Sequence, residues 1–260
     1  NNGADYQGSM ADFLMLVIVD KTENTYSFLQ FNRDTMTEVA LIDHNGEGEA
    51  TANIQLCTAH WYGGNREQSC ENTVKSVKKL LGGIQIDGYY ELNMSEIPKL
   101  NNMVDGVTVT LEDDFSKKYP KMKKGATINL DDEQAYAYVH DRYGVGNEEN
   151  TSRMKRQQQY MTGFFKKLQE KVKANPNYAN EVFESLQDVS TTDITIGKIS
   201  NISNIFASGT DKGIFELAGK SKIGQALGDE IDHMEFYVNK KAMVSTMSEL
   251  FGIVEQKNKE

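Results

Sequence analysis

The segment from residue 151 to residue 173 places the strongest constraint on how this chain folds. Its apolar side chains recur at spacings of three, four and seven residues, so they share one stripe of an α-helix. The stripe consists of Met154, Met161, Phe164, Phe165, Leu168 and Val172. We therefore predict a helix that is buried along this side, with Thr151 or Ser152 as its N-cap.

A second repeat in the same segment is polar and cationic, and it lies on a different face from most of the apolar stripe. Residues 151–173 hold seven Lys/Arg and one acid, Glu170, in a chain whose net charge is −10. Cations are unfavourable at a helix N-terminus, whereas the unpaired N–H groups there bind anions. The repeat therefore favours a bound anion, with Arg142 just upstream as a further guanidinium. The alternative is a solvated face, the usual role of a basic helix. The repeat consists of Arg153, Arg156, Gln157 and Tyr160.

Composition narrows the class of protein. A chain of 260 residues can bury a large core, and an acidic balance with a pI near 5.0 argues against a nucleic-acid partner. No apolar run approaches the roughly 20 residues that a membrane-spanning helix needs. The sequence begins with Asn1 instead of Met, which we interpret as a fragment that once followed a signal or an anchor.

Strand-like and helix-like segments alternate along the chain. We expect strands at 13–19, 25–31, 38–43, 84–93, 106–111, 125–130, 215–217 and 235–238, the first of them central and covered on both faces. We expect helices at 73–81, 95–104, 131–139, 151–173, 182–186, 194–206 and 243–251, and a loop at 44–66. This alternation predicts a single α/β domain over residues 1–260, with three α/β/α layers and a central mixed sheet.

Two further features bear on chemistry. Arg33 and Asp34 follow the second expected strand, where such a pair faces a cleft or simply forms an ion pair at a turn. Cys57 and Cys70 are the only cysteines, and they form either one disulfide or two buried thiols. The chain has no CxxC spacing, so the sequence gives only weak support for a zinc site. His44, His60 and His233 have no spaced partners, which is typical of loop or core histidines.

Several stretches occur in a consistent order. They are Asp12 with its apolar strand, Asn32-Arg33-Asp34-Thr35, Trp61-Tyr62-Gly63-Gly64 with Thr73-Val74, residues 84–109, Gln134-Ala135-Tyr136-Ala137-Tyr138-Val139 with Arg142, and Arg153 with Arg156-Gln157-Gln158. In this order they resemble the LytR–CpsA–Psr family, extracytoplasmic proteins of Gram-positive bacteria. The resemblance is good over residues 12–170 and weaker towards the C-terminus.

The resemblance implies a phosphotransferase that moves a glycopolymer, such as teichoic acid, from a polyprenyl-pyrophosphate carrier onto peptidoglycan. It implies Mg²⁺ or Mn²⁺ as cofactor, an apolar slot for the polyprenyl tail, a transmembrane helix just before Asn1 and a place at the extracytoplasmic face of the membrane; we expect a monomer. Guanidiniums suit a pyrophosphate, and carboxylates suit a hard cation. Carried over by position, the implied catalytic residues are Arg33, Asp34, Arg142 and Arg153. The implied headgroup ligands are Arg33, Arg142, Arg153, Arg156, Gln157 and His140, and the implied metal ligands are Asp12, Asp34 and Asn150.

Three positions depart from the family pattern. Met10 and His140 stand where the family has arginine, and Asn150 stands where it has an acid. Each change removes a formal charge from the expected phosphate and metal site, at a cost of about 1.5–3 kcal/mol per charge-assisted contact. Two alternatives to the transferase therefore remain: a polyprenyl-pyrophosphate-binding protein without turnover, and a pyrophosphatase that acts on the same headgroup.

Overall fold

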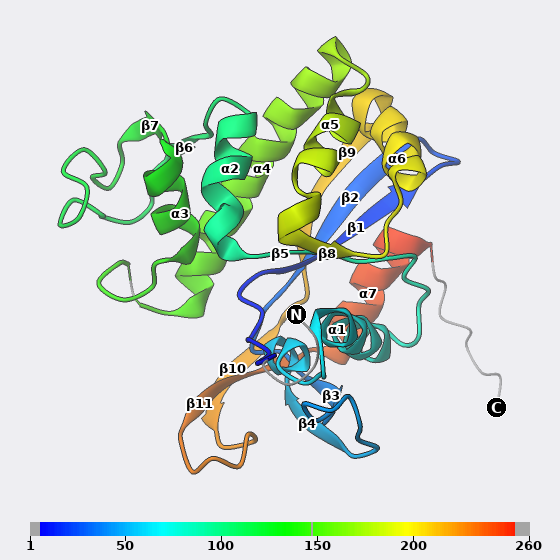
Figure 1. The fold of residues 1–260 in the computed structure, drawn as a ribbon. Coiled ribbons are helices and arrows are strands. Elements are labelled where there is room, and N and C mark those ends of the chain that lie inside the picture. Colours follow the sequence, from blue (N-terminus) through cyan, green and yellow to red (C-terminus); the bar gives the residue numbers. More distant parts are fainter. Residues whose placement is uncertain (1–5, 147, 253–260) are drawn as a thin grey trace.

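The computed structural model describes residues 6–146 and 148–252, and a mixed three-stranded sheet lies at its centre (Figure 1). The strands are β1 (Leu14–Asp20), β2 (Thr25–Phe31) and β9 (Thr210–Glu216), in the order β1-β2-β9. β1 and β2 are antiparallel, with Leu14 opposite Phe31, whereas β2 and β9 are parallel. The predicted mixed sheet is confirmed.

Helices cover both faces of this sheet. On one face, Leu29 and Phe31 of β2 pack in a cluster with Val77 of α1 (Arg66–Leu80) and Met247 of α7 (Lys240–Phe251). On the other face, Phe28 stacks on Phe165 of α4 (Asn150–Ala174) with ring centroids 4.2 Å apart, and α6 (Ile196–Ser208) lies beside it. Because successive side chains of β2 point to opposite faces of the sheet, this strand packs against a helical layer on each side. The three-layer α/β/α prediction is confirmed.

The position of β1 differs from the prediction. We expected residues 13–19 to form a central strand covered on both faces, but β1 is an edge strand and the side chain of Val17 is 51% exposed. An apolar run alone does not reveal which strand acquires a second neighbour, because that depends on a distant segment.

A second hydrophobic cluster lies on the other side of α4. Phe164 of α4 packs there with Tyr138 of α3 (Asp132–His140) and with Val109 of β6 (Thr108–Thr110). β6 pairs with β7 (Thr127–Asn129), and α2 (Ile97–Met103) contacts α3. The apolar stripe predicted for residues 151–173 is therefore shared between two cores, which explains why it runs the whole length of α4.

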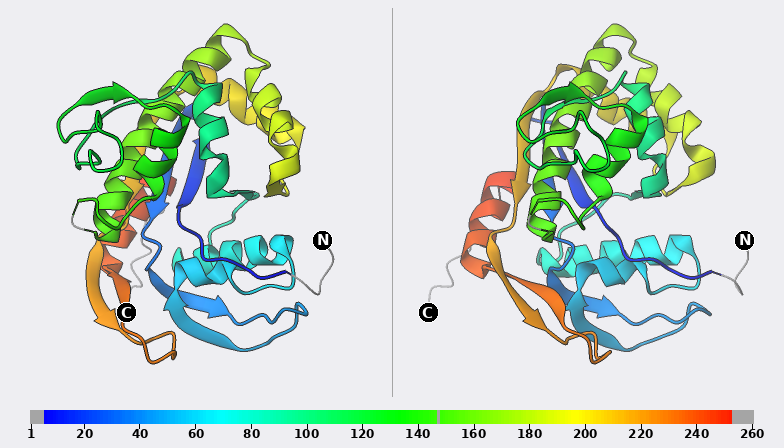
Figure 2. Two further views of the ribbon diagram at one scale, coloured as in Figure 1. Left: turned by 60° about the vertical axis from the view of Figure 1, so that its left-hand side comes forward. Right: turned by 90° about the vertical axis from the view of Figure 1, so that its left-hand side faces the viewer.

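The remaining elements form small ribbons and short helices around these cores. β3 (Met36–Ala40) pairs with β4 (Thr51–Gln55), and Figure 2 shows α1 lying against this ribbon. β5 (Tyr90–Leu92) pairs with β8 (Ser190–Thr192), and β10 (Gly219–Gly224) pairs with β11 (His233–Val238). The others are η1 (Leu56–His60), η2 (Met94–Glu96), α5 (Tyr178–Ser185) and η3 (Gln187–Val189).

Several local predictions need correction. Residues 44–66 are not a loop, since they contain β4 and η1, and β10 was not predicted. The N-cap of α4 is Glu149, so neither Thr151 nor Ser152 begins the helix. The predicted cap of α3 is confirmed, because Asp131 and Gln134 form a reciprocal capping box. Cys57 and Cys70 are separate buried thiols, which decides between the two alternatives. Among the described residues no helix is long and apolar enough to cross a bilayer.

Candidate active site

The antiparallel pairing of β1 and β2 creates the candidate site. Because Leu14 at the start of β1 lies opposite Phe31 at the end of β2, the residues that precede β1 and those that follow β2 are neighbours. Asp12 comes from the first group, and Arg33 and Asp34 come from the second. The N-terminal end of α4 adds Asn150 and Arg153. We call these five residues the acid–guanidinium cluster.

Direct contacts hold the acid–guanidinium cluster together. Asp12 Oδ1 accepts a hydrogen bond from Nη1 of Arg153 at 3.1 Å and another from Nη1 of Arg33. Arg33 Nε lies 3.9 Å from Asp34 Oδ1. Asn150 Oδ1 accepts from Nε and Nη2 of Arg153 at 3.3 and 2.8 Å. The five predicted residues are thus brought into one site, although more than half of the chain separates Asp12 from Arg153.

Cations are crowded at this site. Burial lowers the pKa of Arg153; Asp12 opposes that shift, and the neighbouring Arg33 and Arg142 guanidiniums strengthen it. Burial raises the pKa of the Asp34 carboxyl even though Arg33, Arg153, Arg142 and His233 all favour its ionised form. Arg142 is therefore close enough to act on both groups. Three guanidiniums face two carboxylates here, so a bound anion would relieve the repulsion among them.

One donor in the cluster makes no hydrogen bond to any described residue, although Asp34 lies within ion-pair distance of it. Arg33 Nε is buried and makes no hydrogen bond within the part of the chain that the structure describes. A buried charged donor without an acceptor is costly, and such groups are usually satisfied by a ligand, ion or water. The Nε–H of Arg33 therefore provides a position for an anionic oxygen.

The predicted metal ligands form an oxygen-only set. Asp12 and Asp34 offer carboxylate oxygens, and Asn150 offers an amide oxygen that at present bonds to Arg153. Hard divalent cations such as Mg²⁺ and Mn²⁺ prefer this donor type. The residues present therefore fit the expected ion, with one charge fewer than an acid at position 150 would provide.

Arg156 and Gln157, which were predicted to contact the headgroup, lie outside the acid–guanidinium cluster in this structure. Arg156 is 1% exposed, and its guanidinium bonds to Tyr138 O at 2.9 Å, to Asp113 Oδ2 at 2.5 Å and to Asp141 O. Gln157 donates to Val139 O at 3.1 Å. Both side chains therefore cap the C-terminal carbonyls of α3, which have no partners within that helix. Helical spacing alone does not distinguish this role from phosphate binding.

His140 and Arg142 differ in their placement. The His140 ring stacks on Tyr136 with centroids 4.8 Å apart, and its Nδ1 lies 3.3 Å from Asp141. No hydrogen bond or ring contact among the described residues joins His140 to the acid–guanidinium cluster. Arg142 stacks over Tyr143, with its Cζ 4.6 Å from the ring centroid. Tyr143 is 75% exposed, so Arg142 and Tyr143 form the solvent side of the site.

Sequence reasoning missed three contributors. Asn32 Oδ1 accepts from Asn150 Nδ2 at 3.1 Å and from the Asp34 amide at 2.9 Å, so it links the β2–β3 turn to α4. The buried Cys57 thiol lies beside Arg33, and burial raises its pKa despite that cation, which keeps it neutral. His233 of β11 acts on Asp34. Asn32 could have been found from its position in the turn, whereas nothing in the sequence connects Cys57 or His233 to the site.

The expected slot for a lipid tail matches neither of two cavities found among residues 6–146 and 148–252. These surface cavities, of about 570 and 420 Å³, lie next to β8 and α6 and between α4 and α6, and no cluster residue lines either of them. Instead, an apolar strip leads away from Asp12 along β1. Met15, Val17 and Val19 share the sheet face of Phe28, and Val17 is half-exposed.

Comparison with known proteins identifies the family. The sequence pattern of the LytR_cpsA_psr family matches residues 3–251. Polyisoprenyl-teichoic acid–peptidoglycan teichoic acid transferase TagU of Bacillus cereus (strain AH820) is 29% identical over 168 residues, which are 64% of this chain and 50% of TagU, so the chain spans about half the length of this relative. The crystal structure of B. subtilis TagV has a TM-score of 0.71 at 20% identity, covering 96% of this chain and 93% of TagV. The structure of protein gbs0355 from Streptococcus agalactiae has a TM-score of 0.73 at 20% identity, covering 96% and 82%. Because the family pattern spans nearly the whole chain, the predicted resemblance is confirmed, and the chain belongs to the LytR_cpsA_psr family.

Proposed function

We propose that this chain is a phosphotransferase that moves a glycopolymer from a polyprenyl-pyrophosphate carrier onto peptidoglycan. The observation that carries the proposal is the buried Nε–H of Arg33, which makes no hydrogen bond to the described residues, inside a cluster of guanidiniums and carboxylates. A pyrophosphate would accept this hydrogen bond and offset the crowded positive charge. The name of the B. cereus relative, a teichoic acid transferase, supports teichoic acid as the polymer class, as does a solved structure of TagT bound to LIIa-WTA that shares this fold.

The reaction needs charge neutralisation and positioning more than covalent chemistry from the protein. A sugar hydroxyl of the acceptor attacks the phosphorus that carries the glycopolymer. The bond from that phosphorus to the bridging oxygen breaks, a phosphodiester forms, and polyprenyl monophosphate leaves as the hydroxyl proton is lost. Arg33 and Arg153 stabilise the negative charge that develops on the phosphate oxygens, and Arg142 closes the solvent side.

Mg²⁺ or Mn²⁺ would be held by Asp12, Asp34 and the amide oxygen of Asn150. When bound, it supplies positive charge next to the phosphate oxygens. Since Asp12 now bonds to Arg33 and Arg153, binding of a metal pyrophosphate would redirect these guanidiniums from the carboxylate to the phosphate. The polyprenyl tail would lie along the strip of Met15, Val17 and Val19, and the protein would act as a monomer at the extracytoplasmic face of a Gram-positive membrane.

Binding without turnover is the second candidate, and a specific observation favours it. At the three departures from the family pattern, Met10 places its sulfur 3.2 Å from Nη2 of Arg33, His140 stacks on Tyr136, and Asn150 is neutral. The site thus retains cations that hold a headgroup, but it has lost formal charges that would stabilise a transition state.

One assay separates these readings. The chain is incubated with a lipid-linked pyrophosphate labelled in its glycan, with peptidoglycan and Mg²⁺, and both lipid binding and release of polyprenyl monophosphate are measured. Label on peptidoglycan with released monophosphate supports the transferase. Binding without monophosphate supports the binder, and monophosphate without labelled peptidoglycan supports a pyrophosphatase.

The residue test uses Arg153→Ala, with Lys155→Ala as a control because Lys155 is exposed on the same helix. Loss of one charge-assisted contact to phosphate should weaken headgroup binding by about 1.5–3 kcal/mol, roughly 10- to 150-fold. Lys155→Ala should bind like the parent chain. Equal affinity of the Arg153→Ala chain and the parent would show that the headgroup does not bind at the acid–guanidinium cluster.

A further inference from the structure

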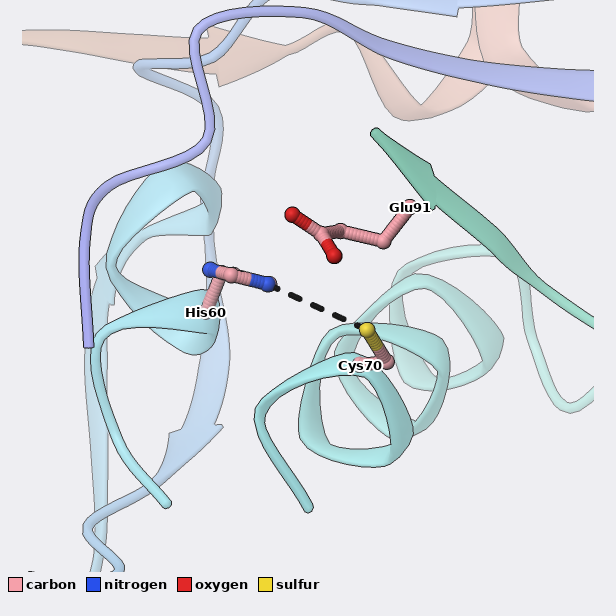
Figure 3. A group of neighbouring side chains, drawn as sticks. All are labelled: His60, Cys70 and Glu91. Atoms are coloured by element: carbon pink, nitrogen blue, oxygen red, sulfur yellow. Dashed lines mark hydrogen bonds between the residues drawn. The ribbon is translucent and has the colours of Figure 1, made fainter. Parts of the chain in front are cut away.

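A second polar cluster lies apart from the acid–guanidinium cluster, between η1, α1 and β5. His60 ends η1, Cys70 lies in the second turn of α1, and Glu91 is in the middle of β5. Their nitrogen, sulfur and oxygen atoms all lie within 4.8 Å of one another. Figure 3 shows the three side chains converging, with the Glu91 carboxylate directed towards the gap between His60 and Cys70. His60 and Cys70 are buried.

The hydrogen bonds of His60 orient it as a ligand. Its Nδ1 lies 2.9 Å from the carbonyl oxygen of Ser9, and only a protonated Nδ1 can donate to a carbonyl. The neutral ring therefore carries its free lone pair on Nε2, which faces Cys70 Sγ at 3.9 Å. Metal-binding histidines typically donate their other ring N–H to a backbone carbonyl or a carboxylate in this way.

Glu91 is also held from outside the cluster. Its Oε2 accepts from Nη2 of Arg66 at 2.6 Å, which holds the carboxylate in place. A hydrogen-bonded carboxylate ligand of this kind is common around protein-bound metals.

We propose that His60 Nε2, Cys70 Sγ and a carboxylate oxygen of Glu91 bind one zinc ion, with a water molecule as fourth ligand. Zinc accepts mixed nitrogen, sulfur and oxygen ligands in tetrahedral geometry, at about 2.0–2.3 Å. Those bond lengths place a zinc-bound nitrogen and sulfur roughly 3.6 Å apart, close to the 3.9 Å between His60 and Cys70. Magnesium is excluded by the same ligand set, because it prefers oxygen.

The charges of this site balance when the thiol ionises. Burial raises the pKa of Cys70 to about 12, so the empty site holds a neutral thiol. Zinc displaces the thiol proton to solvent and binds the thiolate. A thiolate and a carboxylate then neutralise the two charges of the ion, and His60 stays neutral. One ion would tie η1, α1 and β5 together and would hold Ser9, three residues before Asp12.

The test is a titration of the metal-free chain with Co²⁺ and Zn²⁺. Co²⁺ should produce a near-ultraviolet thiolate-to-metal charge-transfer band at one equivalent, which oxygen ligands cannot produce, and Zn²⁺ should displace it and raise the Tm. Cys70→Ser should lose the band. His60→Gln and Glu91→Gln should weaken zinc binding by at least about 100-fold, more than the loss of an outer hydrogen-bond partner usually costs.

Cys57→Ser is the matched control, because Cys57 is the other buried thiol, and its chain should keep the band. The wild-type titration keeps the test decisive even if Cys70→Ser fails to fold. Absence of the band, together with no effect of Zn²⁺ on the wild-type Tm, would show that the three side chains form only a hydrogen-bonded cluster. A band that is lost in Cys57→Ser and kept in Cys70→Ser would likewise refute the site.

Discussion

Substitution of Arg156 tests whether this arginine has a structural role, in contrast to Arg153 in the acid–guanidinium cluster. The Arg156 guanidinium is buried and bonds to the Asp113 carboxylate and to two carbonyls at the end of α3. Removing one partner of a buried ion pair costs about 3–5 kcal/mol. Each carbonyl left unsatisfied adds about 1–3 kcal/mol, less what water recovers. Allowing for water at the two carbonyls, we therefore expect Arg156→Ala to lower the free energy of unfolding by at least about 4 kcal/mol.

Urea unfolding followed by circular dichroism measures this change, with the m-value as a check on two-state behaviour. Lys155→Ala serves as control, because Lys155 is exposed and should change stability by less than about 0.5 kcal/mol. At a temperature where the Arg156→Ala chain stays folded, its pyrophosphate affinity should equal that of the parent. A loss of stability below about 1 kcal/mol together with a large loss of affinity would refute the capping role and return Arg156 to the headgroup.

Three further predictions concern charge and the lipid strip. Asp34→Asn should raise the Tm at pH 7 and abolish transfer. Burial raises the pKa of the Asp34 carboxyl, so this group stabilises the fold fully only below its ordinary pKa of 3.8 and loses that contribution as the pH rises through its folded pKa. The gain in Tm from the substitution should therefore shrink as the pH falls towards 3.8. Asn150→Asp should tighten Mg²⁺ binding about tenfold in calorimetry, because ligand charge sets affinity at such sites. Val17→Asp should weaken binding of a long-chain polyprenyl pyrophosphate relative to a short-chain one in a vesicle-free binding assay, whereas Val244→Asp, at a comparably exposed valine on α7, should not.

The contrary outcomes are equally specific. A lower Tm for Asp34→Asn at pH 7 would mean that the guanidiniums outweigh burial at this carboxyl. Unchanged Mg²⁺ affinity in Asn150→Asp would remove position 150 from the metal site. If Val17→Asp weakens the binding of long-chain and short-chain lipids equally, the lipid tail does not lie along the strip on β1.

Features with a local signature could be predicted from the sequence. The stripe of α4 and the cap at Asp131 depend on neighbouring residues, and both are found in the structure. Asp12, Arg33 and Arg153 were predicted as site residues from the order of their motifs. In the structure both arginines donate to the Asp12 carboxylate.

Features that depend on distant segments could not be predicted. β1 is at the edge because β9, far along the chain, occupies the other side of β2. The roles of Arg153 and Arg156 differ because α3 ends beside one and not the other, although both lie on the same face of α4. His60, Cys70 and Glu91 come from three elements, so no spacing connects them in the sequence.

The parallel pairing of β2 with β9 has a consequence for how the protein is made. β2 receives this partner only from Thr210–Glu216, after most of the chain has been synthesised. Until then one row of its amides and carbonyls is open, which is a template for pairing with another copy. Long-range parallel pairing is also slow, because a large loop must close first. A nascent or truncated chain that ends before Thr210 should therefore aggregate through the strand that leads into Arg33. The same late step that protects this strand also completes the support of the β2–β3 turn.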